Sequence, residues 1–565
     1  MEDISLGPFS LGINNLAQDY ALPRPTKESP NSALMDAYNV DITDDGSVKQ
    51  RPGYALISPF MLGHSLASVE GKTFLGIGSQ MGVVNDLDPL DMTFLRSGLS
   101  GSRIDYVGLA GEVWWSDGSA SGRCSSSNVD YPWVLPTPSL PVVGLGAGVL
   151  DPGMYRVSIS YSSANCGESA ATLPEFIQLG DEGGLLVTLP TAPSGVETTN
   201  IYCTDSNGGE LMLFSSVVAA TVTVSINAAP QGRSLAGRCF LAPLPPGDIV
   251  AIHNGRLLSA SGDMLYYSET YDFGLHQPAK NYLRFPANIT IVAPCVGGVY
   301  IVADKTYWYA GADIALAECI EKLPYGAVKG TRFDLVDDKA VGWFGANGFV
   351  IASMAGEITT PQEKTFSVPV AATGAVLLRE SDGLTVLIAS LDDTAAYTSR
   401  SSKAFRTRLD ETTEDPSTVV MNLSTGATTR YTNFYMTSMC KIGDKYYGVD
   451  DTGLHVLEGG KDNLLSIPWE IGFGRYGLKS DVLKHLSNVY IGGIFSARVE
   501  LVVRTPTNEH VYTSRGYSDA LNVQRIDPGK GLRYTWYDLS LRNVDGYYIE
   551  LVSVTIKLAY SKRRI

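Results

Sequence analysis

The feature that most constrains the fold of this chain is a recurring unit of two short strands joined by a tight polar turn. Runs such as 73–77, 299–302 and 446–449 are rich in Val, Ile, Tyr, Thr and Phe, and turns containing Gly, Asn or Asp precede them. β-Branched and aromatic residues favour strands, and small polar residues accept the positive φ of a hairpin turn. The pattern predicts an all-β chain, with short helices expected only at 32–38 and 479–486.

The spacing of these units predicts an irregular β-propeller. Within 56–146, and again within 231–460, successive units follow at intervals of roughly 40–50 residues, the length of a propeller blade. A stack of irregular β-sheets would give a similar pattern, so both arrangements stay open at this stage. Hydrophobic residues make up 44% of the chain, enough to supply a core in either case.

A regular alternation of apolar and polar residues interrupts the propeller pattern. Residues 153–161 alternate cleanly, and further strands follow at intervals of about 10–15 residues up to 226. This spacing is typical of an immunoglobulin-like or fibronectin-like β-sandwich. The expected organisation is therefore an N-terminal arm and hairpin (1–55), a first propeller segment (56–146), an inserted β-sandwich (147–230), a second propeller segment (231–460) and a C-terminal β-domain (461–565).

The charge balance excludes a protein that reads nucleic-acid sequence. The chain of 565 residues has 43 Lys and Arg against 59 Asp and Glu, a formal net charge of −16. Binding to phosphate backbones depends on clustered cations, and only 562–564 form a short cluster. An acidic wall past which DNA slides without sticking needs only carboxylates and is compatible with this composition.

No motif in the sequence indicates catalysis or a bound cofactor. The seven cysteines are scattered without a Cys-x-x-Cys pair, which predicts reduced thiols rather than a zinc site or a disulfide framework. The nearest approach to a nucleophile elbow, 118–122, has Ala where the serine belongs. We therefore expect no catalytic residue, metal or cofactor. Aromatic clusters such as Trp114-Trp115 and 307–309 could bind sugars, but interior packing is the favoured interpretation.

Several stretches carry a family resemblance. Near the N-terminus, 12–15, 37–41 and 51–54 read Gly-Ile-Asn-Asn, Ala-Tyr-Asn-Val-Asp and Arg-Pro-Gly-Tyr. Region 244–330 contains Leu-Pro-Pro-Gly and Leu-Pro-Tyr-Gly-Ala-Val, and 529–533 reads Gly-Lys-Gly-Leu-Arg. Together they resemble tail proteins of tailed bacteriophages, in particular the nozzle, or tail tubular protein B, of short-tailed phages.

The resemblance implies an oligomeric ring, commonly a hexamer, with β-propellers around a central channel. Such a ring would attach below the adaptor of the portal, contact tail fibres or spikes, retain packaged genomic DNA and conduct it during ejection. It implies a place in the virion tail after assembly in the host cytoplasm, without membrane insertion. Residues in the opening motifs are expected at the assembly interface, on an arm that becomes ordered only against a partner: Gly12, Asn14, Asn15, Asn39, Asp41 and Arg51.

Two other functions stay open from the sequence. The chain could be a tail-tip, baseplate or host-surface-binding protein whose sandwich or C-terminal domain engages glycans through exposed aromatic rings. It could also be a polysaccharide-degrading enzyme, although the sequence lacks the Asp-box turns of sialidase-type propellers.

Overall fold

Strands make up nearly all of the regular structure of this chain. The computed structural model describes residues 2–335, 340–368, 371–392, 418–477, 482–529, 531–543 and 545–564. Within these ranges the one helix is a single 3₁₀ turn, η1 (Arg238–Phe240), and no helix is long and apolar enough to cross a membrane. The all-β prediction is confirmed.

The prediction of two short helices is wrong, because the described residues of both segments form strands or bridges. Leu34 forms a parallel bridge with Ile13, and the following residues form strand β2 (Asp36–Tyr38). The described residues of the second segment belong to the long strand β46 (Val482–Phe495). In both places pairing with distant strands overrides the local helix signal.

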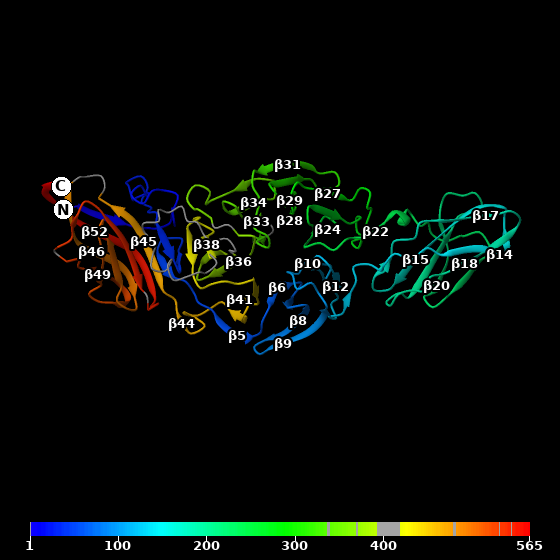
Figure 1. Ribbon diagram of the computed structural model, residues 1–565, viewed down its shortest axis with the longest axis horizontal. Coiled ribbons are helices and arrows are strands. Elements are labelled where there is room, and N and C mark those ends of the chain that lie inside the picture. The colour runs from blue at the N-terminus through cyan, green and yellow to red at the C-terminus, as the bar shows by residue number, and fades with distance from the viewer. Residues whose placement is uncertain are drawn as a thin grey trace.

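Three modules follow one another along the long axis of the molecule (Figure 1). A C-terminal sandwich, with both chain termini, lies at one end. A set of small sheets occupies the middle, and an inserted sandwich formed by residues 142–226 projects at the other end.

The middle module has a propeller-like arrangement of seven four-stranded antiparallel groups among the described residues. Six follow the chain directly, and the seventh is completed by an early strand, β5, which pairs with β42 near the end of the module. The groups are β6 (Gly63–Val69), β7 (Lys72–Ile77), β8 (Gln80–Leu87), β9 (Leu90–Ser97); β10 (Asp105–Leu109), β11 (Glu112–Ser116), β12 (Ser121–Cys124), β13 (Asp130–Tyr131); β23 (Ile249–His253), β24 (Arg256–Ser261), β25 (Met264–Tyr267), β27 (Tyr282–Arg284); β28 (Ile291–Cys295), β29 (Gly298–Val302), β30 (Thr306–Ala310), β31 (Glu318–Leu323); β32 (Phe333–Asp334), β33 (Ala340–Gly345), β34 (Gly348–Ser353), β35 (Ile358–Thr359); β36 (Thr373–Ser381), β37 (Leu384–Asp392), β38 (Thr418–Asn422), β39 (Thr428–Tyr431); and β40 (Ser438–Ile442), β41 (Lys445–Asp450), β42 (Gly453–Val456), β5 (Ala55–Pro59).

Contacts between neighbouring groups follow a cycle. Strand β6 contacts β10, β10 contacts β23, β23 contacts β28, β28 contacts β33, β32 contacts β36, β36 contacts β40, and β40 contacts β6 again. The first strands β23, β28 and β32 begin at residues 249, 291 and 333, which is 42 residues apart in each case. The repeat length therefore agrees with the spacing seen in the sequence.

Alternating residues of one strand supply two different cores, as the two-residue period of a strand requires. In β30, Trp308 packs between the β28 and β33 groups beside Tyr300 and Trp343. Its neighbours Tyr307 and Tyr309 turn to the opposite side, against Phe285. The aromatic run therefore fills the spaces between adjacent sheets.

The turn at Asn254-Gly255 shows why turn residues in the sequence predict hairpins correctly. Both residues have positive φ, 42° and 78°, and they join β23 to β24. A two-residue hairpin turn of this kind matches the twist of the flanking strands, and Asn and Gly adopt it at low cost. The turn residues Asp44-Asp45-Gly46 likewise predict a hairpin, which is confirmed: they join the paired strands 40–42 and 48–50, and Gly46 has φ 80°.

The inserted module is a sandwich of two antiparallel sheets. One has the order β14-β18-β21, and the other β16-β15-β19-β20 with β17 also beside β15. A core that includes Val157, Leu185, Ile201 and Ile226 fills the space between them. The strands are β14 (Val142–Leu150), β15 (Gly153–Ser163), β16 (Gly167–Glu168), β17 (Glu175–Leu179), β18 (Gly183–Thr188), β19 (Thr198–Cys203), β20 (Met212–Val218) and β21 (Thr223–Ile226).

The C-terminal module is a second sandwich, built from both ends of the chain. One sheet has the order β3-β4-β52-β46-β49, with β1 beside β52 and β50 beside β46; the other runs β2-β45-β51-β47-β48. Strand β2 also pairs with β39, so the second sheet continues into the propeller-like module. The remaining strands are β1 (Glu2–Leu6), β3 (Val40–Ile42), β4 (Val48–Gln50), β45 (Trp469–Tyr476), β47 (Glu500–Arg504), β48 (Glu509–Thr513), β49 (Ser518–Ile526), β50 (Arg533–Tyr534), β51 (Tyr537–Asn543) and β52 (Ile549–Arg564); two short pairs, β22 (Ala242–Pro243) with β26 (Leu275–His276), and β43 (Lys461–Asp462) with β44 (Leu465–Ser466), complete the fold.

Two expectations about this module differ from the structure. The turn residues Asn543, Asp545 and Gly546 predict a hairpin between the last two strands, but β51 and β52 lie in different sheets and do not pair with each other. The arm is not an extended tail: Leu6, Phe9 and Ile13 are at most 2% exposed and belong to the core of the sandwich.

Candidate functional site

The six residues expected at an assembly interface all lie on the seam between the propeller-like module and the C-terminal sandwich. Gly12, Asp41 and two others, Asn39 and Arg51, contact β39 or Thr432, the residue that follows it. Asn15 contacts Ser367, and Asn14 contacts other residues of the arm. Gly12 has φ +63°, and a Cβ there would lie 2.2 Å from the backbone nitrogen of Thr428, so the close approach requires glycine. The next residue, Ile13, donates its N–H to the Thr428 carbonyl at 3.0 Å.

The two asparagines of the opening motif fix the path of the arm. The Asn14 backbone N–H donates to Leu34 at 2.8 Å, and its side chain accepts from the N–H of Ala17 at 3.0 Å. The Asn15 side-chain oxygen accepts from the backbone N–H of Ser367 at 2.8 Å. Asparagine serves here because its short amide can satisfy nearby backbone groups.

A buried ion pair lies at the centre of the seam. The Arg51 guanidinium donates to both carboxylate oxygens of Asp462, at 2.9 and 2.6 Å, with side-chain exposures of 0% and 1%. Its Nε donates to the Asn39 side chain at 2.9 Å and one Nη donates to the Thr432 carbonyl at 2.9 Å. Burial raises the pKa of Asp462, and the Arg51 charge opposes that shift. The two terminal nitrogens of the planar guanidinium match the two carboxylate oxygens in both position and charge.

A second buried pair joins the hairpin to the propeller-like module. Arg379 of β36 donates to Asp41 at 2.8 Å, and both side chains are 5% exposed. The Tyr431 hydroxyl also donates to Asp41. Burial, followed by the neighbouring Asp41 charge, raises the pKa of Tyr431, so the phenol stays protonated and acts as a donor.

These contacts give the predicted residues a role within the chain. Asn39, Asp41 and Arg51 are at most 4% exposed, so in this conformation they are not presented to a neighbouring subunit. Their contact with a second chain stays a prediction without support from their placement. Their principal partners, Asp462, Arg379, Tyr431 and Thr432, were missed, because residues this far apart in the chain share no local sequence signal.

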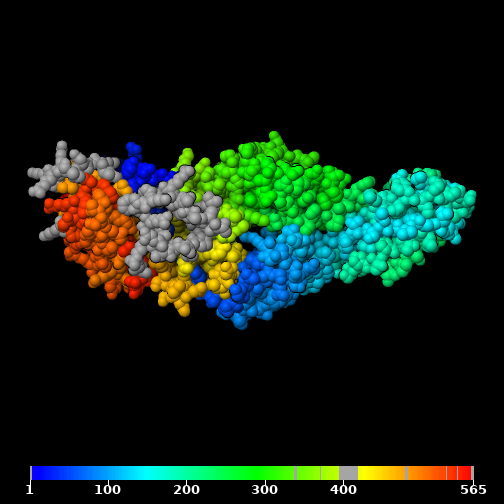
Figure 2. All heavy atoms as spheres, viewed as in Figure 1, coloured from blue at the N-terminus to red at the C-terminus, as the bar shows by residue number. Residues whose placement is uncertain are grey.

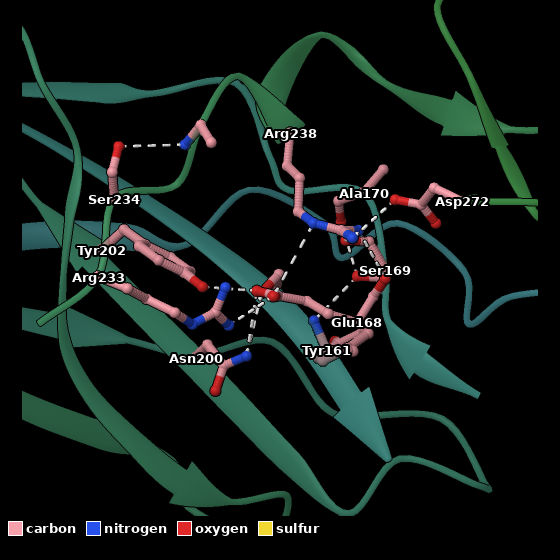
Figure 3. A network of polar contacts seen from close by, with 12 residues as sticks. Tyr161, Glu168, Ser169, Ala170, Asn200, Tyr202, Arg233, Ser234, Arg238 and Asp272 are labelled. Atoms are coloured by element: carbon pink, nitrogen blue, oxygen red, sulfur yellow. Dashed lines mark hydrogen bonds and ion pairs between the residues drawn. The ribbon is translucent and has the colours of Figure 1, made fainter. Parts of the chain in front are cut away.

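A second polar network fixes the inserted sandwich to its linker (Figure 3). Glu168 accepts hydrogen bonds from Ser160, from Tyr202 at 2.6 Å and from Asn200 at 3.2 Å, and its other oxygen accepts from Arg233. Burial alone would raise the pKa of Glu168, but the hydrogen bonds from Ser160, Tyr202 and Arg233 outweigh it and hold the pKa below its ordinary value.

Arg238 carries this network into the propeller-like module. One Nη donates to the carbonyls of Glu168 and Ser169, at 2.8 and 3.2 Å, and the other donates to Asp272 at 2.7 Å. From the part of the propeller-like module that precedes the insert in the chain, Arg123 of β12 donates to the Asn165 carbonyl in the insert. The insert is therefore attached by charged side chains on both sides of its base.

A cavity of about 340 Å³ lies between β10, β23 and β28, each the first strand of its four-stranded group in the propeller-like module. Three cationic and three carboxylate side chains line it, alongside apolar residues of β10, β23 and β28. The charges are matched: Lys329 pairs with Asp248 at 3.2 Å, and Arg332 pairs with Asp334 at 3.1 Å. Burial raises the pKa of Asp105, and the neighbouring Arg103 charge opposes it. The lining is electroneutral and does not select a charged ligand.

No cluster of three or more metal-ligating side chains occurs within the described ranges. The seven cysteines form no disulfide. Trp114, Trp115 and Trp308 are at most 6% exposed, so interior packing is confirmed for these rings and they are not available as sugar platforms.

Comparisons with known proteins give no family. No protein-family model matches the chain, and no curated protein matches it. Among solved structures, a catalytically inactive virginiamycin B lyase from Staphylococcus aureus is 12% identical, covering 72% of this chain and 98% of that one with a TM-score of 0.26. The Pan2 WD40 domain of Neurospora crassa is 8% identical, covering 73% of this chain and 97% of that one with a TM-score of 0.27. The C-terminal WD40 domain of Sif2 is 10% identical, covering 76% of this chain and 96% of that one with a TM-score of 0.26. Likenesses this weak carry no argument about function; the propeller-like description rests on the strand pairing given above.

Proposed function

We propose that this chain is a structural subunit of a bacteriophage tail, similar to the nozzle of short-tailed phages. Copies would form a ring, a hexamer by the resemblance, that extends the DNA channel, retains packaged DNA and conducts it during ejection. Its neighbours would be the adaptor on the portal side, and tail fibres or spikes. Its place would be the virion tail.

The observation that carries this proposal is the seam. Asp41 and Arg51 of the opening motifs join the propeller-like module to the C-terminal sandwich through buried pairs, and Gly12 allows the arm to approach Thr428 closely. A subunit in a conduit wall must transmit load without its modules separating, and buried, bidentate contacts at a module junction serve that purpose. The N-terminal motifs behind the resemblance thus supply contacts that join the two modules.

The net charge of −16 supports a channel that DNA passes without sticking, since like charges repel. We infer that carboxylates line the channel of the assembled ring. A channel surface made mainly of lysine and arginine would contradict this inference.

We also propose that the propeller-like module is a closed seven-bladed propeller and that the insert is an immunoglobulin-like or fibronectin-like sandwich. The cyclic contacts of the first strands support the former. For the insert, β14 pairs with β18 in one sheet, while β15 pairs with β17 and β19, and β19 with β20, in the other. This pairing corresponds to strands B, C, C′, E, F and G of such a sandwich, and β21 adds a further strand beside β18.

Electron cryomicroscopy of virions and native mass measurement of the purified full-length chain test the function. We expect a closed ring on the path of the genome. A chain that stays monomeric at micromolar concentration and is absent from the DNA path in virions would overturn the proposal.

A further inference from the structure

The three-stranded sheet of the insert carries no charged residue. Its strands β14, β18 and β21 contain nine, six and four residues, without a single Asp, Glu, Lys, Arg or His among them. In the whole chain 18% of residues are charged, so such a sheet stands apart from its surroundings.

The remainder of the insert is strongly acidic. Residues 142–226 contain eight carboxylates against one arginine, a net charge of −7. These charges lie on the other sheet and on the loops, for example Glu175 on β17 and Asp181 in the turn before β18. The two sheets of the sandwich therefore present surfaces of different character.

The pairing register defines the outer face of the uncharged sheet. Val142 pairs with Thr188, which pairs with Thr223, and Leu186 pairs with Ser225; all five side chains are exposed. Val142 is 70% exposed and Leu186 is 40% exposed, while Leu185 and Val187, which alternate with Leu186 along β18, are buried. We call the surface of Val142, Leu186, Thr188, Thr223 and Ser225 the neutral face.

We propose that the neutral face is a contact surface for a second copy of this chain. This inference rests on the proposed function, because it assigns one of the lateral contacts of the ring. Two inserts of charge −7 repel each other, so copies can approach at low electrostatic cost only where neither presents carboxylates. Aliphatic and hydroxyl groups without cations exclude DNA as the occupant, and the absence of exposed aromatic rings on this face disfavours a glycan.

The position and size of the face agree with this occupant. The insert forms a lobe at the end of the molecule, remote from the C-terminal sandwich, where it can reach a neighbour (Figure 2). At about 3.4 Å per residue and 4.8 Å between strands, its strands cover roughly 300 Å². A stable pair needs about 800 Å² per partner, so the neutral face acts together with other contacts, as in a closed ring.

Two substitutions on the face, each with a matched control, test the proposal in the full-length chain. Leu186→Lys and Val142→Lys place an ammonium group on the face, and Leu316→Lys and Val296→Lys place one at apolar positions of the propeller-like module that are 88% and 72% exposed. Sedimentation velocity over a concentration series measures the concentration at which half of the chain is assembled. We expect about a tenfold increase for each face variant and less than about twofold for the controls.

The outcomes separate this inference from the proposed function. If the wild type and both face variants form rings at the same concentration, the ring stands and the neutral face does not contribute to it. If the wild type itself does not assemble, both proposals fail. Thermal melting shows whether each variant is folded. If Leu186→Lys lowers the melting temperature, its effect on assembly is set aside, and the result for Val142→Lys, on the edge strand β14, tests the neutral face.

Discussion

Replacing Arg51 by methionine removes one partner of the most deeply buried ion pair of the seam. The substitution keeps an unbranched side chain in place of the Arg51 methylene stem but removes the guanidinium, and so leaves the Asp462 carboxylate without its bidentate partner. It also removes the donors to Asn39 and Thr432. Breaking a buried pair in this way costs about 3–5 kcal/mol, because an uncompensated charge stays buried.

Native-state hydrogen exchange measures this cost locally, which suits a chain of several modules whose global unfolding is not two-state. The reporters are the Thr432 N–H, which donates to the Asn39 side chain at 2.8 Å, and the Asn39 N–H, which donates to Arg430 at 2.8 Å. A loss of about 3–5 kcal/mol corresponds to a fall in protection of about a hundredfold to a few thousandfold.

The matched control is the exposed pair Arg284–Asp263, whose side chains are 73% and 36% exposed. Arg284→Met should cost at most about 1 kcal/mol, since solvent screens surface pairs. The double variant Arg51→Met with Asp462→Asn should be less destabilised than Arg51→Met alone, because no buried charge remains. If Arg51→Met changes protection no more than Arg284→Met does, the seam does not depend on this pair and the case for a rigid subunit fails.

Two further predictions concern the arm and the base of the insert. Deleting residues 2–20 removes Leu6, Phe9 and Ile13 from the core, at roughly 1.5–3 kcal/mol each, so we expect the C-terminal sandwich to lose protection along β52 and to become protease-sensitive; unchanged exchange in β52 would contradict this. Glu168→Gln should lower the stability of the insert by about 2–3 kcal/mol near neutral pH. Because the folded pKa of Glu168 lies below its unfolded value, this contribution is present above about pH 4.3 and is lost as the pH falls through the folded pKa. The urea midpoints of wild type and variant should therefore converge as the pH falls below the folded pKa, and a gap independent of pH would refute the assignment.

Local features of the fold were predictable, and long-range ones were not. The hairpins at Asp44-Asp45-Gly46 and Asn254-Gly255 follow from residues that accept positive φ. The turn residues Asn543, Asp545 and Gly546 have the same chemistry, yet the strands on either side, β51 and β52, pair with other strands in two different sheets. Turn residues permit a reversal of the chain but do not specify which strands pair.

The candidate site shows the same division. The motifs containing Asn39 and Arg51 could be recognised in the sequence, but their role could not. Arg51 binds a carboxylate 411 positions away along the chain, and nothing near Asp462 marks it as the partner. The burial of polar groups in the seam arises only once the propeller-like module and the C-terminal sandwich are packed together.

The sequence by itself determined the strand content, the turns, the repeat length and the net charge, because each of these depends on neighbouring residues or on composition. Only the tertiary structure decided that the arm is built into the chain's own core, and that three separate uncharged stretches form one face of a sheet. Both depend on pairing between strands that are distant in the chain. Such pairing is selected by the fit of whole surfaces, which no short stretch of residues encodes.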